Sequence, residues 1–443
     1  VRRDGLSSLS AANRFGVFPG FSAGWRVSEE GFWKNSTFLS KNINEFKLKG
    51  SYAVVGNPIG GFPFLSLFGA GNYGNISGFI PSLVGNPDLQ WETSNKLDIG
   101  IELSLLNNRF TLVADYFRND IDGLILDVPT PLSTGVPGNI IRQNIGRQRN
   151  YGFEVTFGGD VVRKKDFNWN LNVNYTNVQN NIESLYSIGN TPVPFIQPNG
   201  QFNLLQVGQP VNVLHGFRYA GVNSANGNPM YFNAGNQLIQ HNIATNSFHF
   251  ASSKNDPTLG TQTSLTFNDR TYLGQAIPTW FGGLTNTFSY KGFSLEVFLR
   301  YSGGNKIFNN TRQEALLNMG FQNNGREILN RWTTPGQITD VPRVVLGQSN
   351  AINQVNFAIS RFIEPGEFLR LQNLVISYNL ESKFLSDKTR GYVKSARIFI
   401  QGQNLAVWTK YSGADPENIS EFGIDASVSP QVRITTFGVS LGF

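Results

Sequence analysis

The sequence predicts an all-β fold, an antiparallel transmembrane β-barrel, and three observations carry that prediction. Apolar and polar residues alternate along many segments, short and long connections between the segments alternate, and few charges accompany many aromatics. Charged residues make up 15% and aromatic residues 13% of the 443 residues. Mean hydropathy is only −0.21, as in a barrel, where alternate strand residues face lipid. No run of about 20 apolar residues, the length of a spanning helix, occurs.

Composition also excludes several classes of site. Cysteine is absent, which removes disulfides, thiolate nucleophiles and zinc–cysteine sites. The net charge is +6, but basic residues are scattered, with no run longer than Arg163-Lys164-Lys165, so no nucleic-acid partner is predicted. The chain opens on Val1 without a secretory signal, and we therefore expect a mature or truncated chain, or part of a longer one.

Period-2 alternation is the main secondary-structure signal. Residues 96–105 alternate leucine or isoleucine with lysine, aspartate, glycine, glutamate and serine, and residues 168–176 alternate large apolar residues with asparagine. Such segments are half-buried strands, which by themselves fit a soluble sandwich as well as a barrel. The expected strands lie near 14–27, 46–55, 92–105, 109–120, 149–161, 167–178, 280–290, 293–303, 367–379, 394–408 and 434–443.

The connections favour the barrel, because outer-membrane barrels join strands by short periplasmic turns and long outer loops. The alternation of short and long connections predicts about twelve strands, the first of which ends within residues 1–5. The gap at 28–45 is expected to hold a small periplasmic helix, and strand-like residues 214–222 are expected to pair with 270–273. The short connections are 107–108, 162–166, 291–292 and 381–393; the long ones are 56–91, 121–148, 179–279, 304–366 and 409–433.

The last expected strand places Phe437, Val439, Leu441 and Phe443 on one face. A terminal aromatic after such alternation resembles the assembly signal of outer-membrane barrels, so Phe443 is the candidate for that role. Tryptophans at strand ends fit the interfacial girdles of a barrel. These are Trp25, Trp91, Trp169, Trp280 and Trp408.

Several sequence blocks follow one another along nearly the whole chain and together are similar to the SusC-type (SusC/RagA) family of TonB-dependent outer-membrane transporters. The clearest block, residues 85–93, opens an expected strand, and another, residues 410–417, follows the expected strand 394–408. The blocks are 18–30, Gly85-Asn86-Pro87-Asp88-Leu89-Gln90-Trp91-Glu92-Thr93, 331–333 with 340–343, 368–374, Gly402-Gln403-Asn404-Leu405, and Lys410-Tyr411-Ser412-Gly413-Ala414-Asp415-Pro416-Glu417.

The resemblance implies that residues 1–443 are the C-terminal part of a 22-stranded barrel, roughly its last 12 strands, with the N-terminal plug, the TonB box and the earlier strands absent. It implies an outer-membrane protein, not an enzyme, that imports a nutrient oligomer, a glycan or a peptide. The implied partners are a SusD-like surface lipoprotein lid, the TonB complex through the missing N-terminal part, the lipid bilayer, and a dimer of transporter–lid pairs.

Two other functions stay open at this stage. A SusC-like barrel could be a structural subunit of a secretion or assembly complex without import activity. A soluble all-β binding module is the third reading, and it conflicts with the alternating loop lengths.

Candidate sites are few. Gly69-Ala70-Gly71-Asn72-Tyr73-Gly74 matches G-x-G-x-x-G, but no helix start follows, so we expect a flexible loop. The three histidines are expected in loops rather than on a metal. Residues 311–332 are expected to form a short helix that packs over the barrel mouth or contacts a lid. The histidines are His215, His241 and His249.

Two groups of residues remain as binding candidates. Asp415, Glu417, Glu421 and Asp425 form either a solvated acidic loop or a structural calcium site, with Asp415 and Glu417 as the ligand candidates and no other cofactor expected. Four aromatics in the outer loops are candidates for substrate contact, although exposed loop aromatics also simply pack loops. They are Tyr73, Tyr231, Phe321 and Tyr411.

Overall fold

The computed structural model of the chain describes residues 1–188, 191–196, 202–348, 352–354, 356–380 and 387–443. The chain divides into two compact units, which are described separately below. Unit 1 comprises Val1–Phe195, Gln206–Pro210 and Gly282–Glu296, and unit 2 comprises Ile196–Leu205, Val211–Phe281 and Val297–Phe443. Among the described residues, no helix has the length and apolar character needed to cross a membrane.

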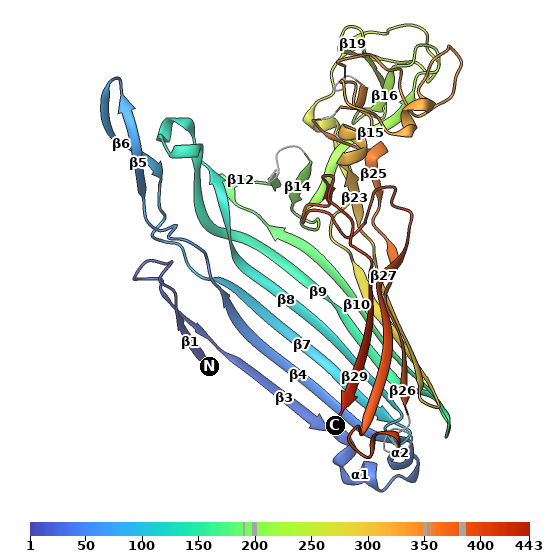
Figure 1. The fold of residues 1–443 in the computed structure, drawn as a ribbon. Coiled ribbons are helices and arrows are strands. Elements are labelled where there is room, and N and C mark those ends of the chain that lie inside the picture. The colour runs from blue at the N-terminus through green and yellow to red at the C-terminus, as the bar shows by residue number, and fades with distance from the viewer. Residues whose placement is uncertain (189–190, 197–201, 349–351, 355, 381–386) are drawn as a thin grey trace. The chain divides into compact units, whose positions relative to one another are not determined.

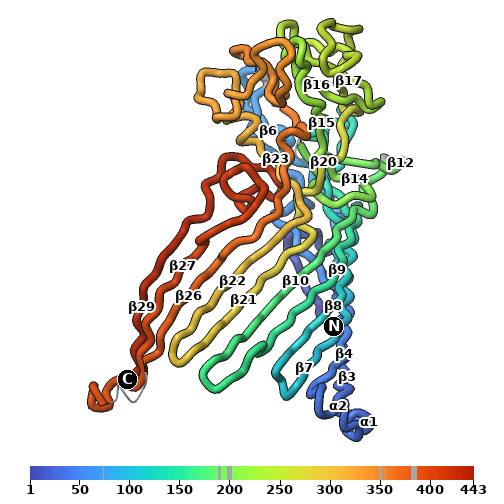
Figure 2. Tube along the Cα trace, turned by 90° about the vertical axis from the view of Figure 1, so that its right-hand side faces the viewer, coloured from blue at the N-terminus to red at the C-terminus, as the bar shows by residue number. Residues whose placement is uncertain are grey.

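Unit 1 is dominated by long antiparallel strands that lie side by side in the order β21-β10-β9-β8-β7-β4-β3 (Figure 1; β21 is labelled in Figure 2). Each expected strand of this part is present, which confirms a mostly antiparallel sheet. The prediction of a long connection at 121–148 is wrong, because β8 and β9 extend into these residues and leave only 130–139 as the connection. The strands are β3 (Gly20–Arg26), β4 (Ile43–Asn57), β7 (Glu92–Leu105), β8 (Phe110–Pro129), β9 (Ile140–Arg163), β10 (Phe167–Ser184) and β21 (Trp280–Tyr290).

The alternation gives this sheet two unlike faces. Large apolar side chains on one face are widely exposed, with Ile99 at 54% and Phe153 at 46%. Exposure of that extent along several strands suits lipid better than water. The other face carries charge, where Lys49 Nζ lies 2.8 Å from Asp115 Oδ1. Gly100 makes room for this pair, since a Cβ there would lie 1.9 Å from the same oxygen.

Tight turns join the strands where the sequence predicts them. Lys291 and Gly292 both have positive φ angles, 48° and 86°, which is the conformation of a two-residue turn whose twist matches that of paired strands. Asn107 and Asn108 also have positive φ, a conformation that asparagine tolerates better than most residues. The expected 381–393 connection falls partly outside the described residues.

The smaller elements of unit 1 include two short helices, α1 (Gly31–Lys34) and α2 (Thr37–Asn42), which confirm a helix within 28–45. The G-x-G-x-x-G segment is no loop. Its residues 69–73 lie in β5 (Leu67–Tyr73), and Gly74 lies in the turn to β6 (Ile76–Leu83), with which β5 forms a hairpin. The remaining elements are β1 (Arg2–Gly5), β2 (Phe15–Phe18), η1 (Val27–Glu29), η2 (Leu132–Thr134), η3 (Pro137–Asn139), β11 (Ser187–Ile188), β12 (Thr191–Pro192) and β13 (Phe195–Ile196).

Unit 2 contains a second set of long strands, in the order β29-β27-β26-β22 (Figure 2). Their apolar faces are again exposed; Val439 at 65% is the partner of Ile398 at 51%. Phe443 follows the last strand and is 77% exposed. The strands are β22 (Phe293–Gly303, of which residues from Val297 onward belong to this unit), β26 (Phe368–Leu380), β27 (Ser395–Thr409) and β29 (Ile434–Gly442).

The expected long loops of unit 2 are largely ordered and share a hydrophobic core. Fully buried Leu214, Tyr231 and Phe308 belong to one cluster with Phe362. Segments of this length need their own core to offset the entropy of ordering. The elements are β14 (Asn203–Gln206), β15 (Val213–Val222), β16 (Pro229–Phe232), β17 (Leu238–Asn242), β18 (Ser247–Phe250), β19 (Gln262–Thr263), η4 (Phe267–Asp269), β20 (Thr271–Gln275), β23 (Lys306–Asn309), β24 (Ala358–Ile359), η7 (Ser360–Phe362), β25 (Ile363–Pro365) and β28 (Ile424–Asp425).

Two expectations for this part have opposite outcomes. The pairing of 214–222 with 270–273 is confirmed, because β15 pairs with β20 through His215 and Tyr272. The prediction of one short helix at 311–332 is wrong. A π-helical turn, η5 (Thr311–Ala315), and a 3-10 turn, η6 (Arg326–Asn330), stand there, separated by a segment rich in asparagine and glycine, which disfavour helix.

The histidines lie in strands, not in loops. His241 on β17 is buried between the side chains of Asn246 and Gln354, with ring nitrogens 2.9 and 2.8 Å from them. His249 on β18 contacts Ser247 and the carbonyl oxygen of Gly260. His215 on β15 packs against the ring of Phe267.

His215 gives unit 2 a pH-dependent stability. Burial, and then the charge of Arg270, lower the pKa of His215 to about 4. The unfolded state binds the proton first, so this contribution is complete above about pH 6.5 and declines as pH falls toward 4. Its size is about 3 kcal/mol, from about 1.4 kcal/mol per pKa unit. Hydrogen exchange of β15 amides, corrected for intrinsic rates, should lose protection across that range, and His215→Gln should flatten the loss. An equal pH slope in both proteins would contradict this expectation.

Candidate functional site

A three-stranded sheet in unit 2 gathers segments that are far apart in the sequence. The central strand β23 pairs antiparallel with β25, through Ile307 and Glu364, and parallel with β28, through Asn309 and Asp425. The turn η5 follows β23 directly and carries Thr311 and Arg312. The sheet thus places polar side chains from three parts of the chain at one point.

Glu364 is the most heavily hydrogen-bonded group there. Its carboxylate accepts from the Ser412 backbone N–H at 2.7 Å and the Ser412 hydroxyl at 2.8 Å. It also accepts from Asn309 Nδ2 at 3.2 Å and from Arg312 Nη1 at 3.0 Å. A buried carboxylate requires such partners, because an unpaired one costs several kcal/mol.

Arg312 links this carboxylate to Glu327 on η6. Its Nε and Nη2 donate to the two Glu327 oxygens at 2.6 and 2.7 Å, a bidentate pair. Arg361 also donates to Glu327 at 2.7 Å. Two guanidiniums and two carboxylates therefore form one charge-balanced network, which fixes the long segment after β23.

The network sets the protonation states. Burial would raise the pKa of Glu327, but its bonds to Arg312 and the charges of both arginines hold that pKa below the ordinary value. Its stabilising effect is therefore complete above about pH 4.3 and is lost only as pH falls through the lowered pKa. The bonds that Arg312 donates to Glu327 in turn raise the pKa of Arg312. Burial and the Asp425 carboxylate raise the pKa of Tyr411, which stays a hydrogen-bond donor to Asp425.

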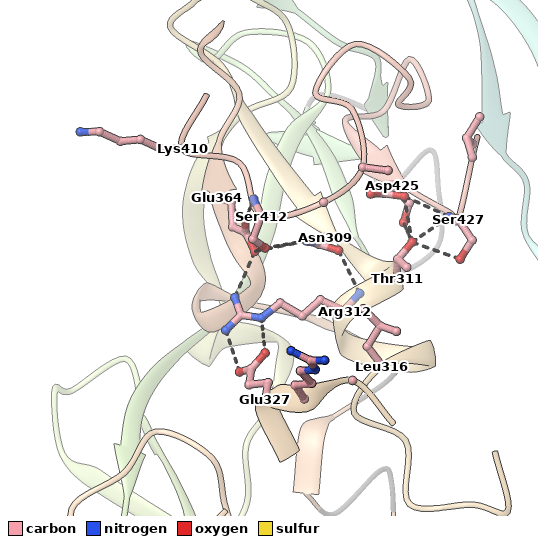
Figure 3. Close-up of a pocket in the computed structure, with 15 residues that line it drawn as sticks. Asn309, Thr311, Arg312, Leu316, Glu327, Glu364, Lys410, Ser412, Asp425 and Ser427 are labelled. Atoms are coloured by element: carbon pink, nitrogen blue, oxygen red, sulfur yellow. Dashed lines mark hydrogen bonds and ion pairs between the residues drawn. The ribbon is translucent and has the colours of Figure 1, made fainter. Parts of the chain in front are cut away.

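A pocket of about 780 Å³ opens beside these groups (Figure 3). Figure 3 shows Arg312 between Glu364 and Glu327, with Thr311, Asp425 and Ser427 grouped across from it, and Lys410 extending away from Ser412. The exposed side chains of Leu316 and Val428 add an apolar rim. The described residues of the lining include no histidine, and the Ser412 hydroxyl donates to the Glu364 carboxylate, which is already paired with Arg312. Such a pocket suits noncovalent binding of a polar solute.

The structure separates the four aromatic candidates. Phe321 is 98% exposed between η5 and η6. Tyr231 is fully buried in the core of unit 2, and Tyr411 is only 5% exposed. Both rings pack the interior, which is the alternative to substrate contact that the sequence left open. Tyr73 ends β5, and its side chain lies outside the described set.

Asp415 and Glu417, for which the sequence left a solvated loop and a calcium site open, are paired with arginines instead. Arg370 Nη2 lies 2.5 Å from Asp415 and Arg370 Nε 2.6 Å from Glu417. Arg300 lies 2.8 Å from Glu417. Two arginines neutralise the two carboxylates, so a cation would have to displace a guanidinium. Nor do the described residues bring three or more histidine, aspartate or glutamate side chains together as a metal site.

Arg312, Glu327 and Glu364 were missed by the sequence-based reasoning. They lie in segments without alternation, and the bonded pairs are 15 and 52 residues apart. No local spacing marks such pairs in one sequence.

Residues 1–250 match the family described as "TonB dependent receptor-like, beta-barrel", and that match covers more than half of the chain. The chain belongs to this family. TonB-dependent receptors are outer-membrane transport proteins without enzymatic activity, so this receptor chain lies in the outer membrane and is not an enzyme.

Individual receptors cover the whole of this chain. It is 30% identical to TonB-dependent receptor P3 of Formosa agariphila and 27% identical to TonB-dependent receptor SusC of Bacteroides thetaiotaomicron, and it spans 43% and 42% of those proteins. It also superimposes on the RagAB peptide importer in the closed-closed state with a TM-score of 0.81 and 25% identity, over 100% of this chain and 45% of the other. The chain thus spans less than half the length of the receptors it matches.

Loss of the Arg312 guanidinium should destabilise the segment around the pocket of this receptor chain. Arg312→Gln removes the bidentate partner of Glu327, which keeps Arg361, and one of the four donors to Glu364. Breaking a buried ion pair costs about 3–5 kcal/mol. Because Arg312 is 21% exposed, we expect about 2–3 kcal/mol in a urea titration. Arg142→Gln is the matched control, since its pair with Asp127 is about half exposed and should cost under about 1 kcal/mol. Equal losses would contradict the role assigned to Arg312.

Removal of divalent cations should leave the stability of unit 2 unchanged. Because arginines hold Asp415 and Glu417, the urea midpoint of the full-length receptor should be the same in excess EGTA and in millimolar Ca²⁺. Arg370→Gln is the informative variant, because it leaves Asp415 without its arginine and Glu417 with Arg300 alone, and it should make the midpoint depend on Ca²⁺. A calcium-dependent midpoint in the unmodified protein would contradict the arginine assignment.

Proposed function

We propose that this chain forms barrel wall and outer loops of a TonB-dependent importer of a nutrient oligomer, a peptide or a glycan. The observation that carries the proposal is the pocket of about 780 Å³ in a receptor chain of this family. Its hydroxyls, amide and charged groups offer hydrogen bonds to a polar chain. The network through Arg312 holds these groups in place before any ligand arrives, which lowers the entropic cost of binding.

The likeness to the RagAB peptide importer favours the peptide class. Peptides carry charged termini as well as amides, and the pocket offers both signs of charge. Glu364 and Asp425 already accept several hydrogen bonds, whereas Arg326 has no carboxylate within ion-pair distance among the described residues. A peptide C-terminal carboxylate therefore has a partner in this pocket.

The rest of the assembly follows from the same proposal. The described wall strands would be part of the last twelve of 22 strands, with the plug and the TonB-contacting segment elsewhere in the full-length protein and Phe443 as the assembly signal. Phe321, Leu329 and Ile338 on unit 2 are exposed at 98, 71 and 94%. Apolar side chains exposed to this degree fit contact with a surface lipoprotein lid, and a dimer of such transporter–lid pairs is the expected assembly.

Filling the pocket should block uptake. Val428 lines the pocket and is 50% exposed without a polar role, whereas Val432 is 67% exposed and lies outside the lining. In cells that carry the full-length receptor, Val428→Trp should reduce uptake of fluorescent peptide mixtures at least tenfold, and Val432→Trp should leave it unchanged. An uncoupler of the proton-motive force should abolish uptake in the unmodified protein.

The same assay with glycan mixtures decides between the two substrate classes. Uptake of neither class, with normal amounts of the receptor in the membrane, would overturn the importer proposal and favour a structural subunit.

A further inference from the structure

The strand register of unit 1 maps the apolar face of the wall row by row. Cα partners on antiparallel strands share a face, and alternate residues along each strand do so too. One row across β7, β8 and β9 is Ile99, Tyr116 and Phe153. Two residues further along, the row is Leu97, Arg118, Tyr151 and Gln179, and the next is Asn95, Asp120, Arg149 and Asn181.

The apolar face therefore ends abruptly. Within four residues of β8, the row composition changes from apolar and aromatic to charged and amide. Phe110 begins β8 at the short turn, and Asp120 lies ten residues further. At about 3.4 Å per residue and a tilt of about 40°, that distance spans about 26 Å of height, close to the apolar band of about 25 Å in outer-membrane barrels. The charged row thus lies at the level of the lipid headgroups, on the side of the long loops.

A hollow of about 460 Å³ lies at this boundary. Its lining includes two tyrosines, two arginines and two of its three amides from three neighbouring strands, as well as the carboxylate of Glu183. The first six are Tyr116, Tyr151, Arg118, Arg149, Gln179 and Asn181. The tyrosines are 43 and 38% exposed and form its apolar side. Aromatic rings at this level are typical of the interfacial girdle of a barrel. The hollow therefore has an apolar side toward the membrane and a polar side away from it.

Ion pairs hold the two guanidiniums of Arg118 and Arg149 in place, and each guanidinium keeps an N–H group that has no acceptor in the described part of the chain. Arg118 Nε donates to Asp120 at 2.9 Å, and Arg149 Nε donates to the other Asp120 oxygen at 2.6 Å. Arg149 Nη1 lies 3.4 Å from Glu183. Arg118 Nη2 lies 2.7 Å from Asp120. These contacts leave Arg118 Nη1 and Arg149 Nη2 without a partner among the described residues. Fixed guanidinium edges with spare N–H donors match the oxygens of a phosphate.

We propose that this hollow binds the phosphorylated headgroup of a glycolipid in the outer leaflet. The phosphate lies against Arg118 and Arg149, the sugar hydroxyls bond to Gln179 and Asn181, and the acyl chains run along Tyr116 and Phe153. The two arginines are balanced by Asp120 and Glu183, so a free ion gains little net attraction. Affinity therefore needs the headgroup and the chains together, which favours a lipid over soluble phosphate.

The test uses the full-length receptor purified from outer membranes in detergent, with purified lipopolysaccharide as the probe. Native mass spectrometry should show lipopolysaccharide bound to the unmodified protein, and inorganic phosphate at millimolar concentration should not displace it. The double variant Arg118→Gln/Arg149→Gln should bind at least tenfold more weakly. Arg142→Gln, which removes an arginine of another pair on β9, should bind normally.

A second variant protects the test against misfolding. Arg118→Lys/Arg149→Lys keeps the charges but loses the planar donor edges, so its affinity should lie between those of the unmodified protein and the glutamine variant. Unchanged binding in a folded glutamine variant would overturn the proposal. So would displacement by inorganic phosphate, which would assign the hollow to a soluble ion.

Discussion

The need to pair every backbone N–H and C=O governs the wall strands of this chain. Water is absent from the hydrocarbon layer, so each unpaired group there costs several kcal/mol. β7 and β8 accordingly run as Cα partners without interruption from Thr93 and Asp122 to Leu105 and Phe110. Register shifts between β8 and β9 appear only beyond Asp122, where water or loop groups can replace a lost strand partner. Regular pairing within the lipid and irregular pairing beyond it share this one cause.

Side-chain alternation made most of the wall predictable from sequence. Residues 92–105, 280–290 and 293–303 were predicted at the boundaries that β7, β21 and β22 have, because lipid on one face imposes strict alternation. The signal fades beyond the membrane, so the extension of β8 to Pro129 was not foreseen. Both faces of the strand meet water or protein there, and nothing selects one residue type at every second position.

The candidate pocket could not be predicted from the sequence, for a different reason. Its sheet joins β23, β25 and β28, three short strands without periodicity, and its arginine network joins residues across tens of positions. Tyr231 and Tyr411 illustrate the related error with aromatics. A long connection rich in aromatics looks like exposed loop, yet a connection of that length folds only by burying such rings. Asp415 and Glu417 show the same effect for charge, since their partner Arg370 lies on β26.

The parallel pairing of β23 with β28 has a consequence for folding. Asn309 and Asp425 are partners although 116 positions separate them, and β26 and β27 lie between them in the sequence. Contacts of such high sequence separation form late, because the chain between them must first be ordered. We therefore expect the wall hairpin of β26 and β27 to form before the pocket. A chain arrested before that step would carry wall strands without a pocket, so binding of the proposed ligand would report that unit 2 has completed its assembly.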